Sequence, residues 1–153
     1  MMTLAFIVAF LVTIIDQFVK KWTTNSLQLH ESRDGIQGVF DFYYIRNEGA
    51  GWGILQGQMW FFYIVTLIIL AYLVYIIYKH RQSNVLQKVT YGLLLGGALG
   101  NFIDRILLGY VVDMFRLLFI NFPIFNIADM ALSLGIFLLI IQVLLVQDTE
   151  GVL

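Results

Sequence analysis

The sequence predicts a membrane all-α bundle of four transmembrane helices with a small extracytoplasmic β-sheet and a short amphipathic segment. Hydrophobic residues make up 60% of the 153 residues. Charged residues make up only 12%, whereas about a quarter of the residues in soluble domains are charged. Four apolar stretches are each long enough to cross about 30 Å of hydrocarbon, which takes about 20 helical residues. A soluble domain of this composition would expose large apolar patches, so a membrane protein is expected.

The four spans are expected within a single membrane domain, residues 1–153. They are placed at residues 1–22, 59–78, 89–108 and 124–146. The first span could be mistaken for a cleavable signal peptide, but no basic residue precedes it and no small-x-small pattern follows it. We therefore expect it to be retained as a helix.

The segments between spans, residues 23–58 and 109–123, are expected to be extracytoplasmic. Residues 39–46 alternate like a strand, with Phe40 and Tyr44 on one face and Asp41 on the other. The second segment is also β-like in composition. Two such strands would form a small sheet lying on the membrane surface.

Polar residues are concentrated at one membrane face. In an up-and-down bundle the first and third connections emerge on the same side. Eight polar residues lie near that side, because they end the first or third span, follow the third span or begin the fourth. They are Asp16, Lys20, Asn101, Asp104, Arg105, Asp113, Asn126 and Asp129. Because a charge at the bilayer centre costs about 2.5 to 3.5 kcal/mol on insertion scales, such residues are functional candidates.

Some of these charges have a structural explanation. Asp16 and Lys20 are spaced i, i+4 and can pair, and Asp104 can pair with Arg105 or with Lys20 across helices. In the third span, glycines at i, i+4 and i+8 from Gly92 predict close packing of a neighbouring helix.

Asp113 and Asp129 lack an obvious local basic partner. If the fold brings the two carboxyls together, they cannot both ionise easily, and the pair shares a proton. The ionised carboxyl could then take a proton from water while the protonated one hydrogen-bonds a scissile carbonyl. The two residues are therefore candidates for a catalytic dyad.

Other chemistries have less support. The chain has no cysteine, and its two histidines lie in separate polar segments, so no metal site or cofactor is expected. A carboxylate metal site of Asp104, Asp113 and Asp129 would lack histidine. A net charge of -1 without a basic stripe gives no indication of nucleic acid binding.

A proton-coupled transporter remains an alternative function, although no internal repeat is evident. A structural assembly subunit is a second alternative.

The chain resembles the lipoprotein signal peptidases, also called signal peptidase II, over nearly its whole length. Five blocks in order carry the resemblance: D-Q-F-V-K (Asp16 to Lys20), N-E-G-A-G-W-G (Asn47 to Gly53), G-G-A-L-G-N-F-I-D-R (Gly96 to Arg105), V-V-D-M-F (Val111 to Phe115) and F-P-I-F-N-I-A-D (Phe122 to Asp129). The resemblance implies an aspartic endopeptidase that cuts prolipoproteins just before a diacylglyceryl-modified cysteine. It also implies that Asp113 and Asp129 are catalytic.

The resemblance implies further roles. Asn101 and Arg105 would hold the substrate backbone, while the supporting residues would be Asn47, Asn126, Asp16, Lys20 and Asp104. From the residues themselves, the small side chains of the stretch that contains Gly49 would let the backbone lie close to a ligand or to the sheet. Trp52 would then either cover the site or enter the lipid, and the family usually has Ala-Phe where this chain has Gly51-Trp52.

The implied location is the bacterial cytoplasmic membrane, with the site on its outer face and both termini cytoplasmic. Charge alone does not settle this orientation, because three of the nine Lys and Arg residues lie in the connection between the second and third spans and six lie on the other side. The expected partners are a prolipoprotein with a diacylglyceryl-cysteine and membrane lipid, with the protein acting as a monomer.

Overall fold

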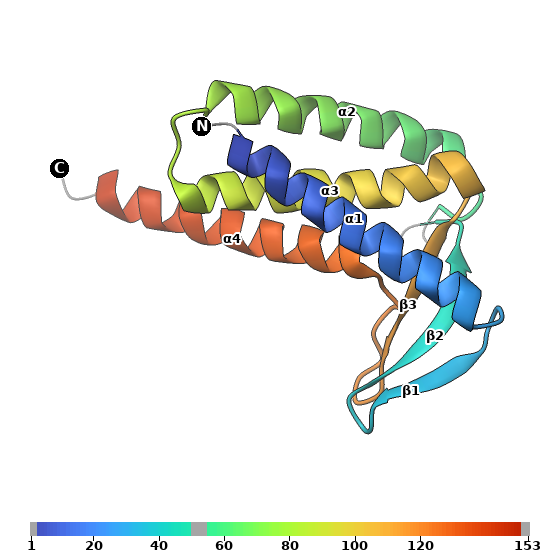
Figure 1. Cartoon of the computed structure of the whole chain (residues 1–153). Coiled ribbons are helices and arrows are strands. Elements are labelled where there is room, and N and C mark those ends of the chain that lie inside the picture. Colours follow the sequence, from blue (N-terminus) through green and yellow to red (C-terminus); the bar gives the residue numbers. More distant parts are fainter. Residues whose placement is uncertain (1–2, 50–54, 151–153) are drawn as a thin grey trace.

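The computed structural model of the chain describes residues 3–49 and 55–150, with side chains as far as residue 145. Four helices run side by side (Figure 1). They are α1 (Thr3–Ser26), α2 (Met59–Lys79), α3 (Val85–Leu108) and α4 (Ile127–Glu150). All four are long and apolar enough to cross a membrane. The expected four-helix membrane bundle is confirmed.

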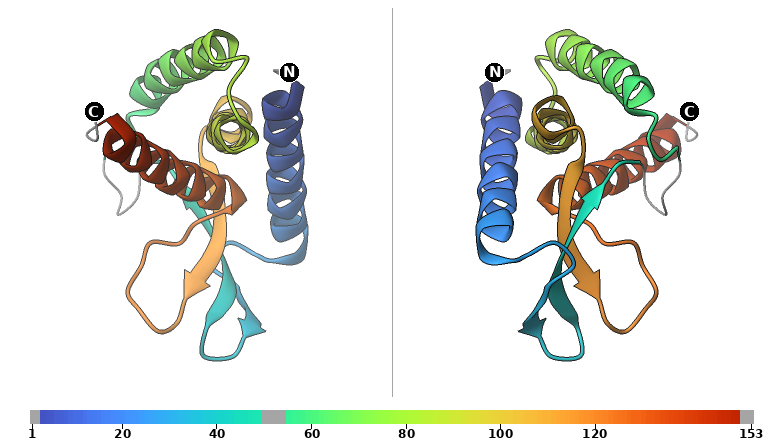
Figure 2. Two further views of the ribbon diagram at one scale, coloured as in Figure 1. Left: turned by 90° about the vertical axis from the view of Figure 1, so that its left-hand side faces the viewer. Right: turned by 90° about the vertical axis from the view of Figure 1, so that its right-hand side faces the viewer.

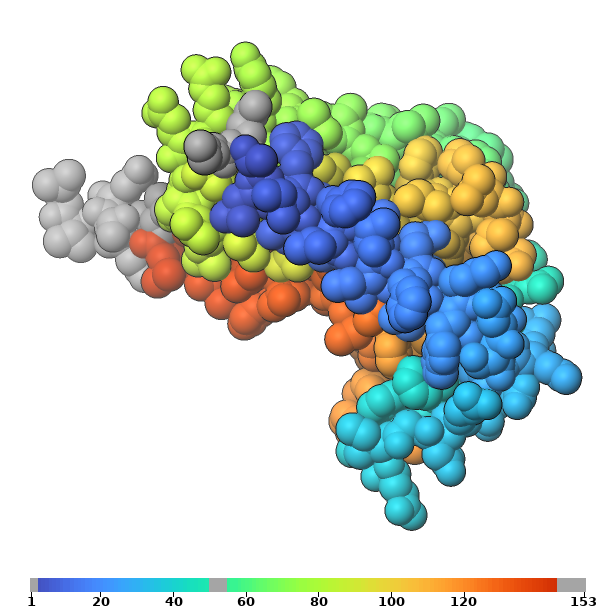
Figure 3. All heavy atoms as spheres, in the orientation of Figure 1, coloured from blue at the N-terminus to red at the C-terminus, as the bar shows by residue number. Residues whose placement is uncertain are grey.

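A small antiparallel sheet lies at one end of the bundle. Its strands are β1 (Ser32–Ile36), β2 (Phe40–Asn47) and β3 (Val111–Leu117), in the order β1-β2-β3. The connections from α1 to α2 and from α3 to α4 meet at this end, while the connection from α2 to α3 lies at the other. The sheet projects beyond the bundle, as the space-filling view shows (Figure 3). We call these the sheet end and the opposite end.

The third helix lies at the centre of the bundle, with the other three around it (Figure 2). A Cβ added at Gly96 would lie 2.7 Å from the Ala9 carbonyl oxygen, and one at Gly92 would lie 2.7 Å from the Ala5 carbonyl oxygen. No side chain fits at such distances, so these glycines let α1 approach α3 closely. The predicted packing stripe is therefore present, and Gly97, beside it, makes the same close approach to α4.

The helix ends differ from the predicted ones. α1 continues four residues further, to Ser26, and α3 begins at Val85 because the Asn84 side chain accepts a hydrogen bond from the Gln87 amide at 2.9 Å. α4 begins at Ile127, since the preceding Asn126 caps the helix. Outside these helices, the described residues contain turns and extended backbone but no further helix, so the short amphipathic segment is not seen there as one.

The sheet has three strands rather than the predicted two. β1 is exposed along its whole length and carries no alternating apolar pattern, which is why the sequence did not indicate it. The predicted alternation in β2 is wrong, because the register shifts between Phe42 and Ile45. Asp41, expected on the face opposite Tyr44, is buried with it, and the Arg116 Nε donates to an Asp41 carboxylate oxygen at 3.0 Å.

Candidate active site

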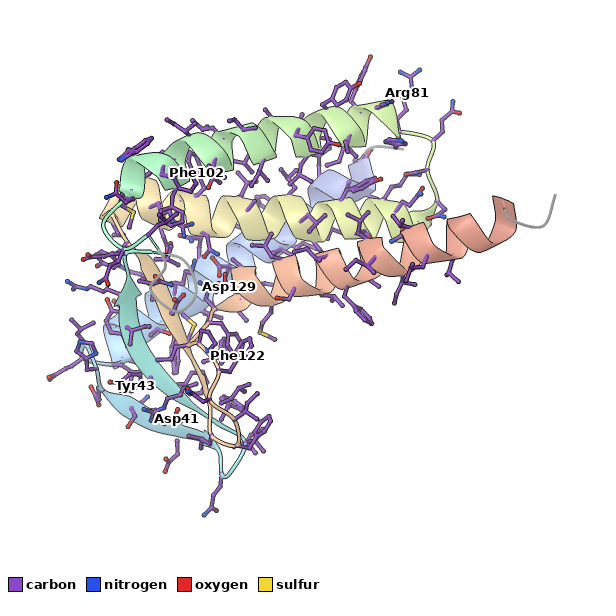
Figure 4. All side chains as sticks on the ribbon, turned by 180° about the vertical axis from the view of Figure 1, so that it is seen from behind. Asp41, Tyr43, Arg81, Phe102, Phe122 and Asp129 are labelled. Carbon is purple, nitrogen blue, oxygen red and sulfur yellow. The ribbon has the colours of Figure 1, made fainter. Side chains whose placement is uncertain are left out.

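One candidate catalytic residue is part of the cap that begins α4. The Asn126 side-chain oxygen accepts a hydrogen bond from the Asp129 amide at 2.9 Å, and the Asp129 carboxylate accepts one from the Asn126 amide at 3.1 Å. This reciprocal pair is a capping box, in which the third residue of the helix satisfies the cap. Figure 4 shows Asp129 at the sheet end of α4, far from Arg81 at the opposite end.

The second candidate catalytic residue comes from β3. Asp113 is 1% exposed and accepts hydrogen bonds from the Asn47 side chain at 2.9 Å and the Asn126 side chain at 2.6 Å. Burial, with the nearby charge of Asp129, raises the pKa of Asp113 to about 7, although the two amide hydrogen bonds favour its ionised form. Asn126 therefore contacts both carboxyl-bearing residues and fixes them relative to each other.

Asn101 connects the two aspartates to the buried charges behind them. Its amide nitrogen donates to the Asp129 carboxylate at 2.7 Å, and its oxygen accepts from the Lys20 ammonium at 3.0 Å and from Asn126 at 3.0 Å. Because Lys20 is a donor only, it fixes which side of the Asn101 amide faces Asp129.

Lys20 also forms two buried ion pairs. Its ammonium lies 2.9 Å from the Asp16 carboxylate and 3.1 Å from that of Asp104, and all three side chains are at most 4% exposed. Asp16 accepts from the Ala128 amide of α4, and Asp104 accepts from the Val112 amide of β3, both at 2.9 Å. The predicted pairing of Asp16 with Lys20 is confirmed, and Asp104 pairs with Lys20 rather than with Arg105.

These contacts explain why the charges are at this depth in the bundle. One ammonium and two carboxylates join α1 to α3, α4 and β3, so they hold the strand that carries Asp113 against the helix that carries Asp129. Gln17 adds a contact that the sequence reading missed, since its amide donates to Asp104 at 2.8 Å. Its position one residue after Asp16, on the same helical turn as Lys20, was the available signal.

A cavity of about 710 Å³ lies in front of the two aspartates. Asp113, Asp129, Asn101, Arg105, Asn47 and Gly49 line its polar part. Thr66 and Ile69 of α2 and Leu132 of α4 line an apolar part that extends into the bundle. Asp16, Lys20, Asp104 and Asn126 lie behind this surface. The cavity can therefore hold an amphipathic ligand that enters between the helices.

Arg105 lies at the edge of this cavity. One guanidinium nitrogen donates to the Gly49 carbonyl at 3.3 Å, while the buried Nε has no hydrogen-bond partner among the described residues. The guanidinium carbon lies 4.8 Å from the centre of the Phe62 ring, and the Tyr63 hydroxyl donates to the Arg105 carbonyl at 3.0 Å. Phe62 and Tyr63 of α2 were missed because aromatic residues are common in membrane helices.

Replacing Phe62 by leucine is expected to lower kcat/KM for the substrate. The change removes the ring below the guanidinium but keeps an apolar side chain. A cation-π contact contributes about 0.5 to 2 kcal/mol, which corresponds to a loss of about 2- to 30-fold. Steady-state kinetics of Phe62→Leu beside Phe137→Leu, a lipid-facing control on α4 that is 59% exposed, would measure it. Equal kinetics in the two variants would show that Phe62 does not position Arg105.

Two further predictions about the site concern a metal ion and the position of Trp52. Among the side chains of residues 3–49 and 55–145, no group of three or more His, Asp or Glu is arranged to hold a metal ion. Gly51 and Trp52, where the sequence departs from the pattern of the family it resembles, lie outside the described residues.

Comparison with known proteins places this geometry in a family. The family model of signal peptidase (SPase) II matches residues 8–145. The chain belongs to the signal peptidase II family. It is therefore an aspartic peptidase of the membrane, and the coarse activity of the family, removal of signal peptides from prolipoproteins, applies to it.

Individual members of the family are similar over nearly the whole chain. The lipoprotein signal peptidase of Bacillus pumilus (strain SAFR-032) is 48% identical over 142 residues, which are 92% of each chain. That of Shouchella clausii (strain KSM-K16) is 48% identical over 96% of this chain and 97% of its own. A solved bacterial membrane enzyme superposes with a TM-score of 0.89 at 42% identity, covering 97% of this chain and 91% of the other.

Proposed function

We propose that the chain is an endopeptidase that cuts a prolipoprotein just before its diacylglyceryl-modified cysteine, with Asp113 and Asp129 activating water. The observation that carries this proposal is the pair of carboxyls joined through Asn126 at the end of a largely apolar cavity. A lipid-modified peptide lies in the bilayer already, so a cavity between helices can receive it from the side.

The two carboxyls have different environments and hence different roles. Asp129 accepts hydrogen bonds from the Asn101 side chain and the Asn126 amide, and we assign it the role of the general base. Asp113, with its raised pKa of about 7, holds the proton. Asp129 takes a proton from water, the water oxygen attacks the carbonyl carbon, and Asp113 donates a hydrogen bond to the carbonyl oxygen.

Collapse of the resulting tetrahedral intermediate breaks the carbon–nitrogen bond. The proton that Asp129 received passes to the leaving nitrogen, which becomes the amine of the lipid-modified cysteine. Arg105, at the edge of the same cavity with its Nε free of partners among the described residues, would hold the substrate backbone. The reaction as proposed uses water and the side chains of this chain.

The proposed orientation places the sheet end on the outer face of the cytoplasmic membrane and both termini inside. The connection at the opposite end carries Lys79, Arg81 and Lys88, which fits a cytoplasmic loop. The carboxyls then lie where water reaches the membrane surface. We propose that the enzyme acts there as a monomer in contact with lipid.

Activity is expected to fall as the pH rises through about 7. The mechanism needs a proton on one carboxyl, and Asp113 loses its proton around that value. The rate should decline by about tenfold per pH unit above it, since the protonated fraction does so. Initial rates from pH 5 to 9 would measure this. A rate that stays constant to pH 9 would assign the proton elsewhere.

The direct test is cleavage of a diacylglyceryl-modified prolipoprotein by the purified chain in detergent, with the products identified by mass spectrometry. The expected products are the signal peptide and a chain that begins with the modified cysteine. The same prolipoprotein without the diacylglyceryl group is the matched control and should be cut far more slowly. Equal cleavage of both forms, or a cut at another bond, would contradict the proposal. A parallel reaction with a chelator tests whether the reaction needs a metal ion.

A further inference from the structure

A second cavity, of about 640 Å³, lies on the other side of the sheet from the candidate active site. Neighbouring residues of a strand point to opposite faces. Val111 and Asp113 line the first cavity, whereas Tyr110 and Val112, each one residue away, line the second. The second cavity lies between the sheet-end termini of α1 and α3, which diverge there (Figure 1). The proposed reaction uses none of its space.

Two positive charges at this cavity lack a carboxylate partner. Lys21 and Arg46 line it, and neither forms an ion pair with a described residue. The Arg46 guanidinium carbon lies 4.8 Å from the centre of the Tyr110 ring, and its Nε donates to the Tyr44 hydroxyl at 3.3 Å. These contacts orient the guanidinium but leave its charge uncompensated.

The other charges of the lining are already compensated. Lys20 is held by two carboxylates. Both carboxylate oxygens of Asp104 are occupied, one by the Gln17 amide and the other by the Val112 amide and Lys20. The carbonyl ends of α1 and α3 disfavour an anion nearby, so an anion held here would depend on Lys21 and Arg46.

The rim of the cavity is apolar and faces lipid. Leu107 and Leu108 end α3 and line the cavity, and they are 74% and 46% exposed. Thr24, on the last turns of α1, and Gln28, just after the helix, are neutral donors that also line the cavity. These turns end a membrane-spanning helix, so the cavity lies at the level of lipid headgroups.

We propose that this cavity binds the phosphate of an anionic phospholipid from the leaflet at the sheet end. Arg46 and Lys21 donate charge-assisted hydrogen bonds to the phosphate oxygens. Thr24 and Gln28 contact the headgroup, and the acyl chains leave past Leu107 into the bilayer. The bound lipid would join α1 to the sheet from the side opposite the catalytic cavity. This site is separate from the proposed function, since binding there involves neither aspartate.

The test is lipid binding by the full chain in detergent, followed by native mass spectrometry. The probes are dioleoyl phosphatidylglycerol and dioleoyl phosphatidylcholine, which share acyl chains, and inorganic phosphate. The proteins are the unsubstituted chain, Lys21→Gln, Arg46→Gln and Arg33→Gln, the last an exposed cation of β1 outside both cavities. Binding is read without any cleavage, so its outcome is independent of the proposed peptidase activity.

Phosphatidylglycerol should bind more tightly than phosphatidylcholine, and Lys21→Gln and Arg46→Gln should each weaken that preference by about fivefold. Arg33→Gln should leave it unchanged. Equal binding of the two lipids, or equal weakening by Arg33→Gln, would overturn the proposal. Binding of inorganic phosphate as tight as that of the lipid would show a site for free anions instead.

Two additional variants complete the test. Arg105→Gln examines the first cavity, and a preference lost in that variant but kept in Arg46→Gln would place the lipid there and overturn the proposal. Arg46→Lys keeps the charge and should retain most of the preference. Melting temperatures of all variants in detergent without added lipid identify any that fail to fold, and the Lys21→Gln result then decides.

Discussion

Asp113→Asn and Asp129→Asn should each reduce cleavage of a diacylglyceryl-modified prolipoprotein by about 10²- to 10⁴-fold, the usual contribution of general acid–base catalysis. Asparagine has nearly the shape of aspartate but cannot accept a proton from water or exchange one with the partner carboxyl. Asp113 is buried against Asn47 and Asn126, so its replacement keeps the packing while removing the titrating group. Single-turnover rates at saturating enzyme would measure the chemical step.

The matched control is Asp34→Asn, which changes an exposed aspartate of β1 outside both cavities. It should cleave at the unsubstituted rate. Circular dichroism and melting curves should show that all three variants are folded. If either Asp113→Asn or Asp129→Asn retains near-normal turnover, the dyad mechanism is wrong and the catalytic groups must be reassigned.

The largest expected effect on stability comes from Lys20→Met. The change leaves Asp16 and Asp104 buried without their cation, each at most 3% exposed. Removing one partner of a buried ion pair typically destabilises a protein by about 3 to 5 kcal/mol, because the remaining charge is uncompensated. Chemical unfolding in detergent should show this loss, together with lower activity, since Lys20 also fixes the Asn101 amide.

Lys21→Met is the neighbouring control. Lys21 is exposed and forms no ion pair with the described residues, so its loss should change stability by less than about 1 kcal/mol. The double variant Lys20→Met with Asp104→Asn should recover part of the lost stability, because it removes one of the stranded charges. A Lys20→Met protein as stable as the control would show that the ion pairs do not hold the bundle to the sheet.

Local patterns in the sequence predicted most of the fold. Apolar length predicted the four spans, and the glycine spacing from Gly92 predicted close packing of a neighbouring helix, because both patterns are local; the structure shows that this helix is α1. Strand β1 could not be predicted in this way, since its residues are exposed and it is held mainly by backbone hydrogen bonds to β2. The burial of Asp41 depends on Arg116, 75 residues away, and on an irregular register.

The sequence predicted which residues form the candidate site better than it predicted the hydrogen bonds between them. Counting helix reversals brought Asp16, Asn101, Asp113 and Asp129 to one face, and the structure brings them into one hydrogen-bonded network. The pairing of each amide donor with a carboxyl depends on side-chain geometry between helices. The spacing of residues in the sequence does not determine that geometry. The capping box at Asn126 and Asp129 corresponds to an N-x-x-D pattern in the sequence, but sequence reasoning placed these residues only at a common membrane face.

The two carboxyls belong to separately built parts of the molecule, one to a strand and the other to a helix. The contacts that hold these parts together include the hydrogen bonds of Asn126 with Asp113 and of Asp104 with the Val112 amide, beside an apolar cluster that contains Leu27 and Met114. A harsh detergent or mild heating that loosens the sheet from the bundle would thus separate the carboxyls while every helix stays intact. Helical content would then be a poor guide during purification, and retained turnover would be the appropriate criterion for choosing a solubilising agent.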